Sequence, residues 1–291
     1  MADSREAVFT EYRPQLFSIA YRMLGSAADA EDIVQDCYLR WSKAAGADIH
    51  SPRQYLASTV TRLCINHLQS ARVRREQYVG PWLPEPVGTR TLPDPVELAE
   101  SLTMAFLVVL ESLSPIERAV FLLSEVFEYS MDETAAMVEK TPANCRQILH
   151  RARQAVAQRR QRYVVPDESA EAILHRFEDA IRGGDLETLM DVLDQNVVLY
   201  SDGGGKVQAA LNPIHGATNV AKFFVGIAKK GALDGIVPVF IELNRQPALI
   251  NYVDGRVSNA VVFDIGEGRV RGIYLVANPD KLETLNKESQ S

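Results

Sequence analysis

The sequence has few cysteines and no long apolar run, and both absences exclude classes of protein. Its three cysteines, Cys37, Cys64 and Cys145, lie far apart and form no C-x-x-C pair, so neither a disulfide framework nor a zinc site is expected. Apolar stretches such as Ala105–Leu110 are far shorter than the roughly 20 residues that span a bilayer. Residues 1–10 contain charges and no apolar core, which argues against a secretory signal. We therefore expect a cytoplasmic protein with reduced thiols and without a metal or cofactor.

The sequence also lacks an overall positive charge, which a nucleic-acid-binding protein usually has. Its net charge is −7, but from Pro166 onward 12 Lys and Arg stand against 18 Asp and Glu, so most of the excess acid lies in the last third. Residues 140–163 contain seven basic side chains and no acid. A nucleic-acid partner for the first part of the chain therefore remains open.

Two proline-containing segments, Gly80–Pro95 and Val164–Ser169, interrupt the helical pattern. They divide the chain into residues 1–78, a semi-rigid linker over 79–95, residues 96–165 and residues 166–291. Apolar residues at three-and-four spacing make both parts before Pro166 helical. Helices are expected over 51–76, 96–112, 115–127, 131–139 and 142–162, three of them opened by a Ser-Pro or Thr-Pro pair.

The last part changes character, from helices to β-rich runs. Helices are expected over 168–182 and 186–193, followed by strands over 197–200, 207–210, 237–243, 248–253, 257–265 and 269–276. Asp254-Gly255 and Glu267-Gly268 have the composition of hairpin turns. The fold class is therefore multidomain, with two all-α domains followed by an α+β domain that contains a curved antiparallel sheet.

The segment Tyr129–Val156 has the lengths of a helix-turn-helix. Cys145, Leu149, Ala152 and Val156 form an apolar stripe on its second helix, which places Arg146, Gln147, His150 and Arg151 on the opposite face. Arginine and glutamine there are the side-chain types that bond guanine and adenine in a major groove. A helical hairpin whose arginines are simply solvated fits the spacing equally well.

A resemblance makes this segment more specific. Glu133-Thr134-Ala135, Thr141-Pro142, Arg146-Gln147 and His150–Arg153 resemble the last domain of extracytoplasmic-function sigma factors, although Glu139 replaces the family's turn glycine and Ile148 a common arginine. The resemblance implies recognition of the upstream promoter element. The implied DNA-binding residues are Lys140, Asn144, Arg146, Gln147, His150 and Arg151.

Tyr21–Gly25, Asp29–Asp36 and Leu39–Trp41 resemble the sigma segment that docks on RNA polymerase. The implied polymerase-binding residues are Asp29, Glu31, Asp32, Gln35, Asp36 and Arg40, although acids at a helix start also simply favour the helix dipole. The next helix, Ser51–Glu76, resembles the one that melts and reads the downstream element. Its implied DNA contacts are Arg53, Tyr55, Arg62, Asn66, Arg72, Arg74 and Arg75, with Tyr55 able to stack on a base or to pack in the fold.

Three further segments look like the signatures of sigma factors that carry a fused SnoaL-like domain, a cone-shaped fold: Trp82–Pro86, Asp202–Lys206 and Asn278–Leu282. The implied regulatory residues are Trp82, Pro84, Asp202, Gly203, Gly204, Gly205, Lys206, Asn278, Pro279, Asp280 and Lys281. We expect the linker to contact the C-terminal domain there, through Trp82 as an aromatic anchor. The alternative is that Trp82 packs on its own helical domain.

The expected function is that of a sigma factor, with core RNA polymerase and promoter DNA as partners, no membrane, no separate anti-sigma factor and no catalysis of its own. The alternative is that the C-terminal domain is an enzyme or a small-molecule sensor. Asp202, His175, His215 and Asp264 are available by type as acids or bases. A closed pocket with convergent polar groups favours this alternative, and an apolar or collapsed interior favours a regulator.

Overall fold

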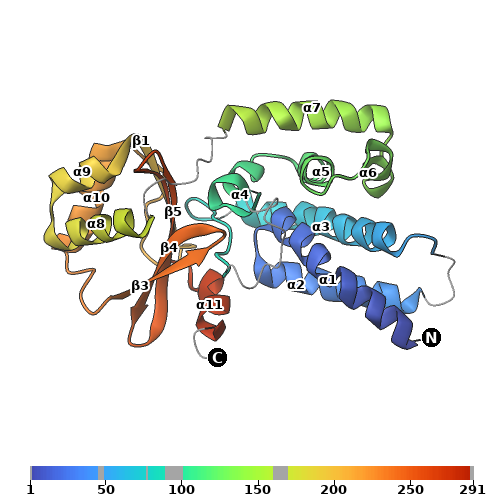
Figure 1. Ribbon diagram of the computed structural model, residues 1–291, viewed down its shortest axis with the longest axis horizontal. Coiled ribbons are helices and arrows are strands. Elements are labelled where there is room, and N and C mark those ends of the chain that lie inside the picture. Colours follow the sequence, from blue (N-terminus) through green and yellow to red (C-terminus); the bar gives the residue numbers. More distant parts are fainter. Residues whose placement is uncertain (1, 45–48, 77, 89–100, 160–169, 289–291) are drawn as a thin grey trace. The chain divides into compact units, whose positions relative to one another are not determined.

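A computed structural model describes residues 2–44, 49–76, 78–88, 101–159 and 170–288 (Figure 1). The chain forms two compact units. The helical unit comprises Met1–Glu76, Arg90–Leu102 and Phe106–Arg160, and the sheet unit comprises Gln77–Thr89, Thr103–Ala105 and Gln161–Ser291. The linker therefore belongs to the same unit as the C-terminal part.

The helical unit begins with three helices that pack on one another, α1 (Ala2–Leu24), α2 (Ala27–Lys43) and α3 (Pro52–Glu76). Gly25 ends α1 with a φ of 67°, and its N–H donates to the Tyr21 carbonyl at 2.7 Å. Ser26 then caps α2 by accepting from the Asp29 N–H. This tight corner turns α2 back along α1.

The next helices are α4 (Met104–Leu110), α5 (Pro115–Phe121), the π-helical turn η3 (Leu122–Val126), α6 (Met131–Met137) and α7 (Pro142–Arg159). Capping boxes start α5 at Ser114 and α6 at Ser130, each with a glutamate three residues later. The expected helix over 115–127 is therefore an α-helix that widens into a π turn. The expected start of α4 at Val96 lies outside the described residues.

The sheet unit begins with α8 (Ala170–Gly183) and α9 (Leu186–Val192), and α9 runs directly into β1 (Leu193–Asp202). The remaining elements are β2 (Ile214–His215), α10 (Ala217–Lys229), β3 (Val237–Leu243), β4 (Gln246–Val253), β5 (Arg256–Gly266), β6 (Arg269–Val276), η4 (Pro279–Leu282) and α11 (Glu283–Glu288). Two expectations were wrong. The predicted strand over 207–210 is a loop, and helix α10 was not predicted.

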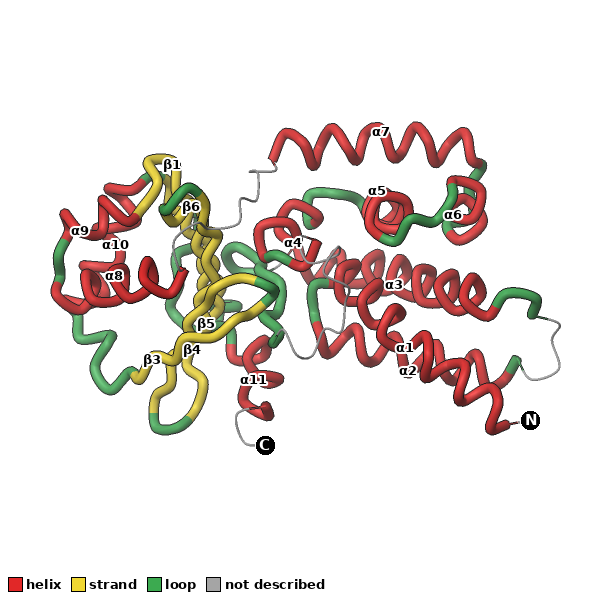
Figure 2. The backbone as a smooth tube through the Cα atoms, viewed as in Figure 1, coloured by secondary structure: helices red, strands yellow, loops and turns green. Residues whose placement is uncertain are grey.

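The six strands form one sheet in the order β2-β1-β6-β5-β4-β3, antiparallel except for the parallel pair β1–β6. Helices α8, α9 and α10 cover one face, and α11 lies on the other (Figures 1 and 2). The predicted turns at Asp254-Gly255 and Glu267-Gly268 are confirmed, since both residues of each pair have positive φ. The helix-covered face carries a core that includes Phe177, Phe224 and Phe263 in edge-to-face contact.

Within the described part of the chain, no helix combines the length and the apolar character that crossing a bilayer requires.

Candidate polymerase, DNA and linker-binding sites

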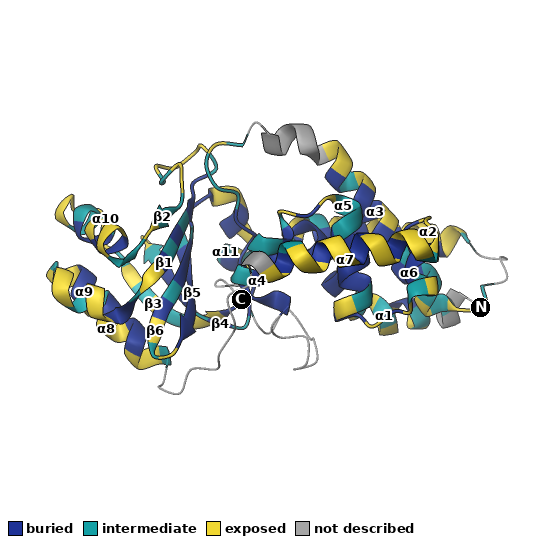
Figure 3. Cartoon of the chain, turned by 90° about the horizontal axis from the view of Figure 1, so that it is seen from above, coloured by how far each residue is buried: buried dark blue, intermediate teal, exposed yellow. Residues whose placement is uncertain are grey.

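Helix α7 separates a buried stripe from a polar face, as the sequence pattern predicts. Cys145, Leu149, Ala152 and Val156 are buried, and α5 and α6 pack against the helix. The predicted DNA-binding residues Lys140, Asn144, Arg146, Gln147, His150 and Arg151 are all exposed, as the banding along α7 illustrates (Figure 3). The neighbouring Arg153 differs from them because it donates to Glu125 at 2.6 Å. The polar face of α7 thus presents side chains of types that can read DNA bases, on a helix that packs against α5 and α6.

The turn before α7 contains a left-handed residue. Glu139 has a φ of 56°, and the Lys140 N–H closes the end of α6 by donating to the Ala135 carbonyl at 3.0 Å. A glycine adopts this conformation without the steric cost that a side chain brings. The turn keeps its geometry here with a glutamate in the glycine position.

Two predicted DNA contacts on α3 are engaged inside the helical unit. Arg62 donates from Nε to the Met137 carbonyl at 3.0 Å and from Nη2 to the Ala136 carbonyl at 2.9 Å, and its guanidinium lies 3.1 Å from Glu139. The Arg53 guanidinium lies 4.8 Å from the centroid of the Tyr129 ring. Both arginines therefore contact the segment around α6 in this conformation.

The other α3 residues differ in exposure. The Tyr55 ring packs on Trp41 with a centroid distance of 5.7 Å, whereas Asn66 is exposed. The side chains of Arg72, Arg74 and Arg75 lie outside the described residues. Packing in the fold is thus the contact that the structure gives Tyr55.

Helix α2 presents most of its predicted docking residues outward. Asp32, Gln35, Asp36 and Arg40 are exposed, whereas Ile33, Val34, Cys37 and Trp41 form the buried stripe. Glu31 pairs with Arg13 at 2.6 Å, and Asp29 lies 3.7 Å from His67 Nε2. Burial raises the pKa of the Cys37 thiol to about 12, which keeps it protonated and unreactive.

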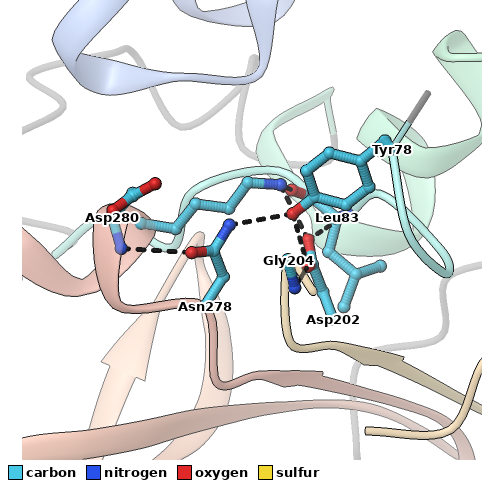
Figure 4. A network of polar contacts seen from close by, with 7 residues as sticks. Tyr78, Leu83, Asp202, Gly204, Asn278 and Asp280 are labelled. Carbon is cyan, nitrogen blue, oxygen red and sulfur yellow. Dashed lines mark hydrogen bonds and ion pairs between the residues drawn. The ribbon is translucent and has the colours of Figure 1, made fainter. Parts of the chain in front are cut away.

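The centre of the sheet unit's linker contact is Asp202, a carboxylate with no exposed surface (Figure 4). Its Oδ1 accepts from the Tyr78 hydroxyl at 2.6 Å and from the Gly204 N–H at 3.0 Å. Its Oδ2 accepts from the Leu83 N–H at 2.9 Å and from Lys281 Nζ at 2.7 Å. One buried carboxylate thus joins the linker to the strand end and to the C-terminal segment.

Lys281 and Asn278 complete this contact from the other side. Lys281 also donates to the Leu83 carbonyl, and its ammonium lies 3.9 Å from the centroid of the Trp82 ring. Asn278 Nδ2 donates to the Tyr78 hydroxyl at 2.8 Å. The expected contact between the three signature segments is therefore present, with Trp82 stacked against a buried cation. We call these residues, Tyr78, Trp82, Leu83, Asp202, Asn278 and Lys281, the linker latch.

Further hydrogen bonds hold the linker along its length. The Val87 N–H donates to Asn244 Oδ1 at 3.0 Å, and the Asn244 N–H donates back to the Val87 carbonyl at 2.9 Å. Glu85 accepts from the Thr284 hydroxyl at 2.7 Å. Beyond the linker, the Met104 N–H at the start of α4 donates to Gln246 Oε1 at 2.7 Å. The linker is thus fixed to the sheet unit at both ends of residues 78–88.

The glycines of Asp202–Lys206 allow close approach. A Cβ on Gly204, whose φ is 60°, would collide with the Asn278 side chain, and one on Gly203 would collide with the Val207 carbonyl. Lys206 forms an exposed pair with Asp280 at 2.7 Å, and Pro279 opens η4. Pro84 is buried within the linker. The run therefore serves tight packing rather than phosphate binding.

Electrostatics inside the latch favour a neutral tyrosine. Burial, and then the hydrogen bond to Asp202, raise the pKa of Tyr78 above its usual value. The Tyr78 hydroxyl therefore stays protonated and donates to the carboxylate.

The four candidate acids and bases of the sheet unit do not converge. Asp202 is used in the latch, and Asp264 lies 3.8 Å from Arg271, with its pKa raised by burial and lowered less by that arginine. His175 is exposed against Phe240, and His215 is exposed on β2. Nor do the described residues contain a cluster of three His, Cys, Asp or Glu side chains with the spacing of a metal site.

Comparison with known proteins identifies the family. Residues 8–74 match the family described as Sigma-70 region 2, and residues 103–156 match Sigma-70, region 4. The chain is 36% identical over 287 residues to the "ECF RNA polymerase sigma factor SigJ" of Mycobacterium tuberculosis, covering 94% of this chain and 91% of that protein. The chain belongs to the extracytoplasmic-function sigma factors of RNA polymerase.

Two further similarities extend over nearly the whole sigma factor. A "Probable ECF RNA polymerase sigma factor SigI" of Mycobacterium tuberculosis is 30% identical and covers 98% of this chain and 97% of its own. The crystal structure of the Mycobacterium tuberculosis SigJ matches with a TM-score of 0.75 and 31% identity, covering 97% of this chain and 98% of that one. The expected architecture, two helical sigma domains followed by a SnoaL-like domain, is confirmed. This sigma factor directs RNA polymerase to promoters and initiates transcription.

Three residues of these contacts were not identified from the sequence of this sigma factor. Tyr78 of the latch, and Asn244 and Gln246 beyond it, lie outside the three signature segments, and their partners are more than 100 residues away. The one available signal was Asn244-Arg245 between two apolar strands, a pair that adopts positive φ as a hairpin turn does.

Proposed function

We propose that α2 docks this sigma factor on core polymerase, that α3 opens and reads the downstream element, and that α7 reads the upstream element. The exposed α7 face is the observation that supports this assignment, because Arg146, Gln147, His150 and Arg151 are exposed while the apolar stripe of the helix is buried. The sigma factor performs no covalent chemistry itself, and the polymerase supplies catalysis.

The SnoaL-like domain regulates the sigma domains through the linker that it holds, in place of a separate anti-sigma factor. The linker latch supports this role, because the segment that joins the two sigma domains is bound by Asp202, Asn278 and Lys281 of the C-terminal part. A polymerase that needs the linker in another conformation must release the latch first.

The contacts of Arg53 and Arg62 fit the same proposal. Both side chains contact residues of the second sigma domain in the free protein, so promoter binding requires them to exchange these partners for DNA phosphates. Arg62 then changes partners from the α6 carbonyls to the DNA backbone.

The test is run-off transcription with core polymerase, comparing the parent with Asp202→Asn and with Arg146→Ala. We expect Arg146→Ala to lose transcription in a promoter-dependent manner and Asp202→Asn to change it on every promoter. Unchanged transcription in Asp202→Asn, with the linker demonstrably released, would refute the regulatory role.

A further inference from the structure

The sheet unit contains a cavity of about 740 Å³ that the linker latch does not occupy. Helices α8 and α10, the loop over 207–210 and the concave face of β4, β5 and β6 line it. Its innermost wall includes the three phenylalanines Phe177, Phe224 and Phe263, which pack edge to face. The volume lies in the range of sites that enclose a small organic molecule, roughly 300–1,000 Å³.

The strand register places the polar residues of the cavity wall in successive rows across the sheet. Ser201 pairs with Leu275, Leu275 with Val261, and Val261 with Leu249, so these four residues form one row across the sheet. Ser201 is 2% exposed and lines the cavity. Its hydroxyl is a hydrogen-bond donor that an acceptor on a ligand in the cavity can use.

The next row is fully polar. Asn251 and Asn259 lie opposite each other, and Asn251 Nδ2 donates to Asn259 Oδ1 at 2.8 Å. This bond leaves Asn251 Oδ1 and Asn259 Nδ2 available to a ligand. From Phe263 to Asn259 is four residues along β5, or roughly 13 Å at the usual rise of a strand. Over that length the cavity wall therefore changes from the aromatic ring of Phe263, through the row that contains the Ser201 hydroxyl, to the amides of Asn251 and Asn259.

A helical glycine faces the same space. Gly226 lies in α10 and lines the cavity, and a Cβ placed on it would meet no atom within 4 Å. Glycine inside a helix is less favourable than alanine, and no close packing of another residue compensates for that cost here. The missing side chain keeps the cavity open.

The charges at the cavity are mainly positive. Glu178 forms an ion pair with Arg182 on α8, whereas Lys222 of α10 and Lys230, which follows that helix, are exposed and have no ion-pair partner among the described residues. Among the described residues, no Asp or His lines the cavity, so Glu178 has no second group there for proton transfer. This composition suits binding of an anion rather than acid–base catalysis.

We propose that this cavity binds an apolar carboxylic acid, with its hydrocarbon body against the phenylalanines and its carboxylate near the asparagine pair and the lysines. The cavity wall also adjoins the linker latch. Ser201 faces the cavity, and the next residue, Asp202, faces the latch, because successive side chains of a strand point to opposite sides. Ala277 and Asn278 repeat this arrangement at the end of β6.

The loop over 207–210 gives a second connection. It lines the cavity, and Gly80 of the linker lies against the backbone of Ala210 and Leu211. A ligand that moves this loop or the two strand ends changes the stability of the latch. This coupling rests on the proposed regulatory function, whereas the binding site itself does not.

Binding is tested first, by calorimetry on the full chain with dodecanoate below its micelle concentration and with dodecan-1-ol as the neutral analogue. We expect one site, with dodecanol binding more weakly. Gly226→Phe should weaken binding by roughly tenfold or more, because it fills the space, and Gly226→Ala should have little effect. Lys230→Glu should weaken dodecanoate by roughly two- to fivefold, the size of an exposed charge contact, while the neighbouring Lys229→Glu should not.

No binding by the parent, or equal binding by a folded Gly226→Phe variant, would overturn the site. Ala232→Trp, at an exposed position of the lining, replaces Gly226→Phe if that variant does not fold. Equal affinity for dodecanol would overturn the carboxylate assignment.

Coupling is tested separately, by the rate of chymotrypsin cleavage at Tyr78, Trp82 and Leu83 with and without dodecanoate. A changed rate in the parent, absent in Gly226→Phe, supports coupling. Binding without any change in the cleavage rate refutes coupling and leaves the site standing.

Discussion

The Lys281 ammonium lies 2.7 Å from Asp202 Oδ2 and 3.9 Å from the centroid of the Trp82 ring. The carboxylate has no exposed surface, and Lys281 is also buried, so the pair is desolvated from both sides. A buried pair of this kind is held by additional hydrogen bonds, which here come from the linker backbone and Tyr78. The contacts that compensate the buried charges of Asp202 and Lys281 therefore also fix the position of the linker.

Asp202→Asn should release the linker. It leaves the buried ammonium of Lys281 without its counter-charge, and breaking a buried ion pair on one side costs about 3–5 kcal/mol. Urea unfolding and chymotrypsin cleavage at Tyr78, Trp82 and Leu83 measure the effect. Asp280→Asn is the matched control, because its pair with Lys206 is exposed and should contribute little. Similar cleavage of both variants would contradict the latch.

Alkaline pH should weaken the same contact. Because the pKa of Tyr78 is raised in the folded chain, its contribution to stability is complete below the unfolded value near pH 10 and is lost as the pH rises above it. The difference in unfolding free energy between the parent and Tyr78→Phe should therefore be constant from pH 7 to about 9 and shrink beyond about 10. Parallel curves over this interval would rule out the Tyr78 contribution.

Arg146→Ala should lower discrimination between upstream promoter elements. A bidentate arginine contact to guanine contributes roughly 1–3 kcal/mol at one base pair. Binding titrations of holoenzyme on single-base-pair promoter variants measure it. Arg153→Ala is the control, since that guanidinium already bonds Glu125. An equal loss on all promoters would make Arg146 a phosphate contact.

Asp32→Lys should slow association with core polymerase. The side chain is exposed on α2, and changing a peripheral charge alters mainly the association rate and its salt dependence. Surface plasmon resonance at two salt concentrations tests this, with circular dichroism to confirm helicity. Asp179→Lys on α8 is an exposed charge reversal outside the docking helix. Identical association rates for both variants would count against the docking assignment.

The sequence predicted the helical part well because its signals are local. Ser114 and Ser130 form the capping boxes that start α5 and α6, and the apolar stripe of α7 is buried as its spacing predicts. The π turn at η3 was not predicted, because the same apolar residues suit an α-helix. The family resemblance, rather than spacing, supplied the functional assignment of these helices.

The sheet unit was harder to predict where tertiary contacts override propensity. Residues 207–210 were predicted as a strand, but only Val207 among them favours a strand, and they form a cavity-lining loop. Helix α10 was missed although Val220, Phe224 and Ile227 have helical spacing. The cavity could not be predicted from the sequence either. The residues of its wall are neighbours only because the strand register pairs Ser201, Leu275, Val261 and Leu249 across the sheet.

The separation of Tyr78 from Asn278, 200 residues along the chain, has a consequence for biosynthesis. The linker leaves the ribosome long before its binding site exists, since Asn278 is made 200 residues after Tyr78. At translation rates of roughly 5–20 residues per second, that interval is about 10–40 s. Both sigma domains have time to fold with an unrestrained linker during that period. A nascent chain that meets polymerase early would therefore escape the restraint that the finished protein carries.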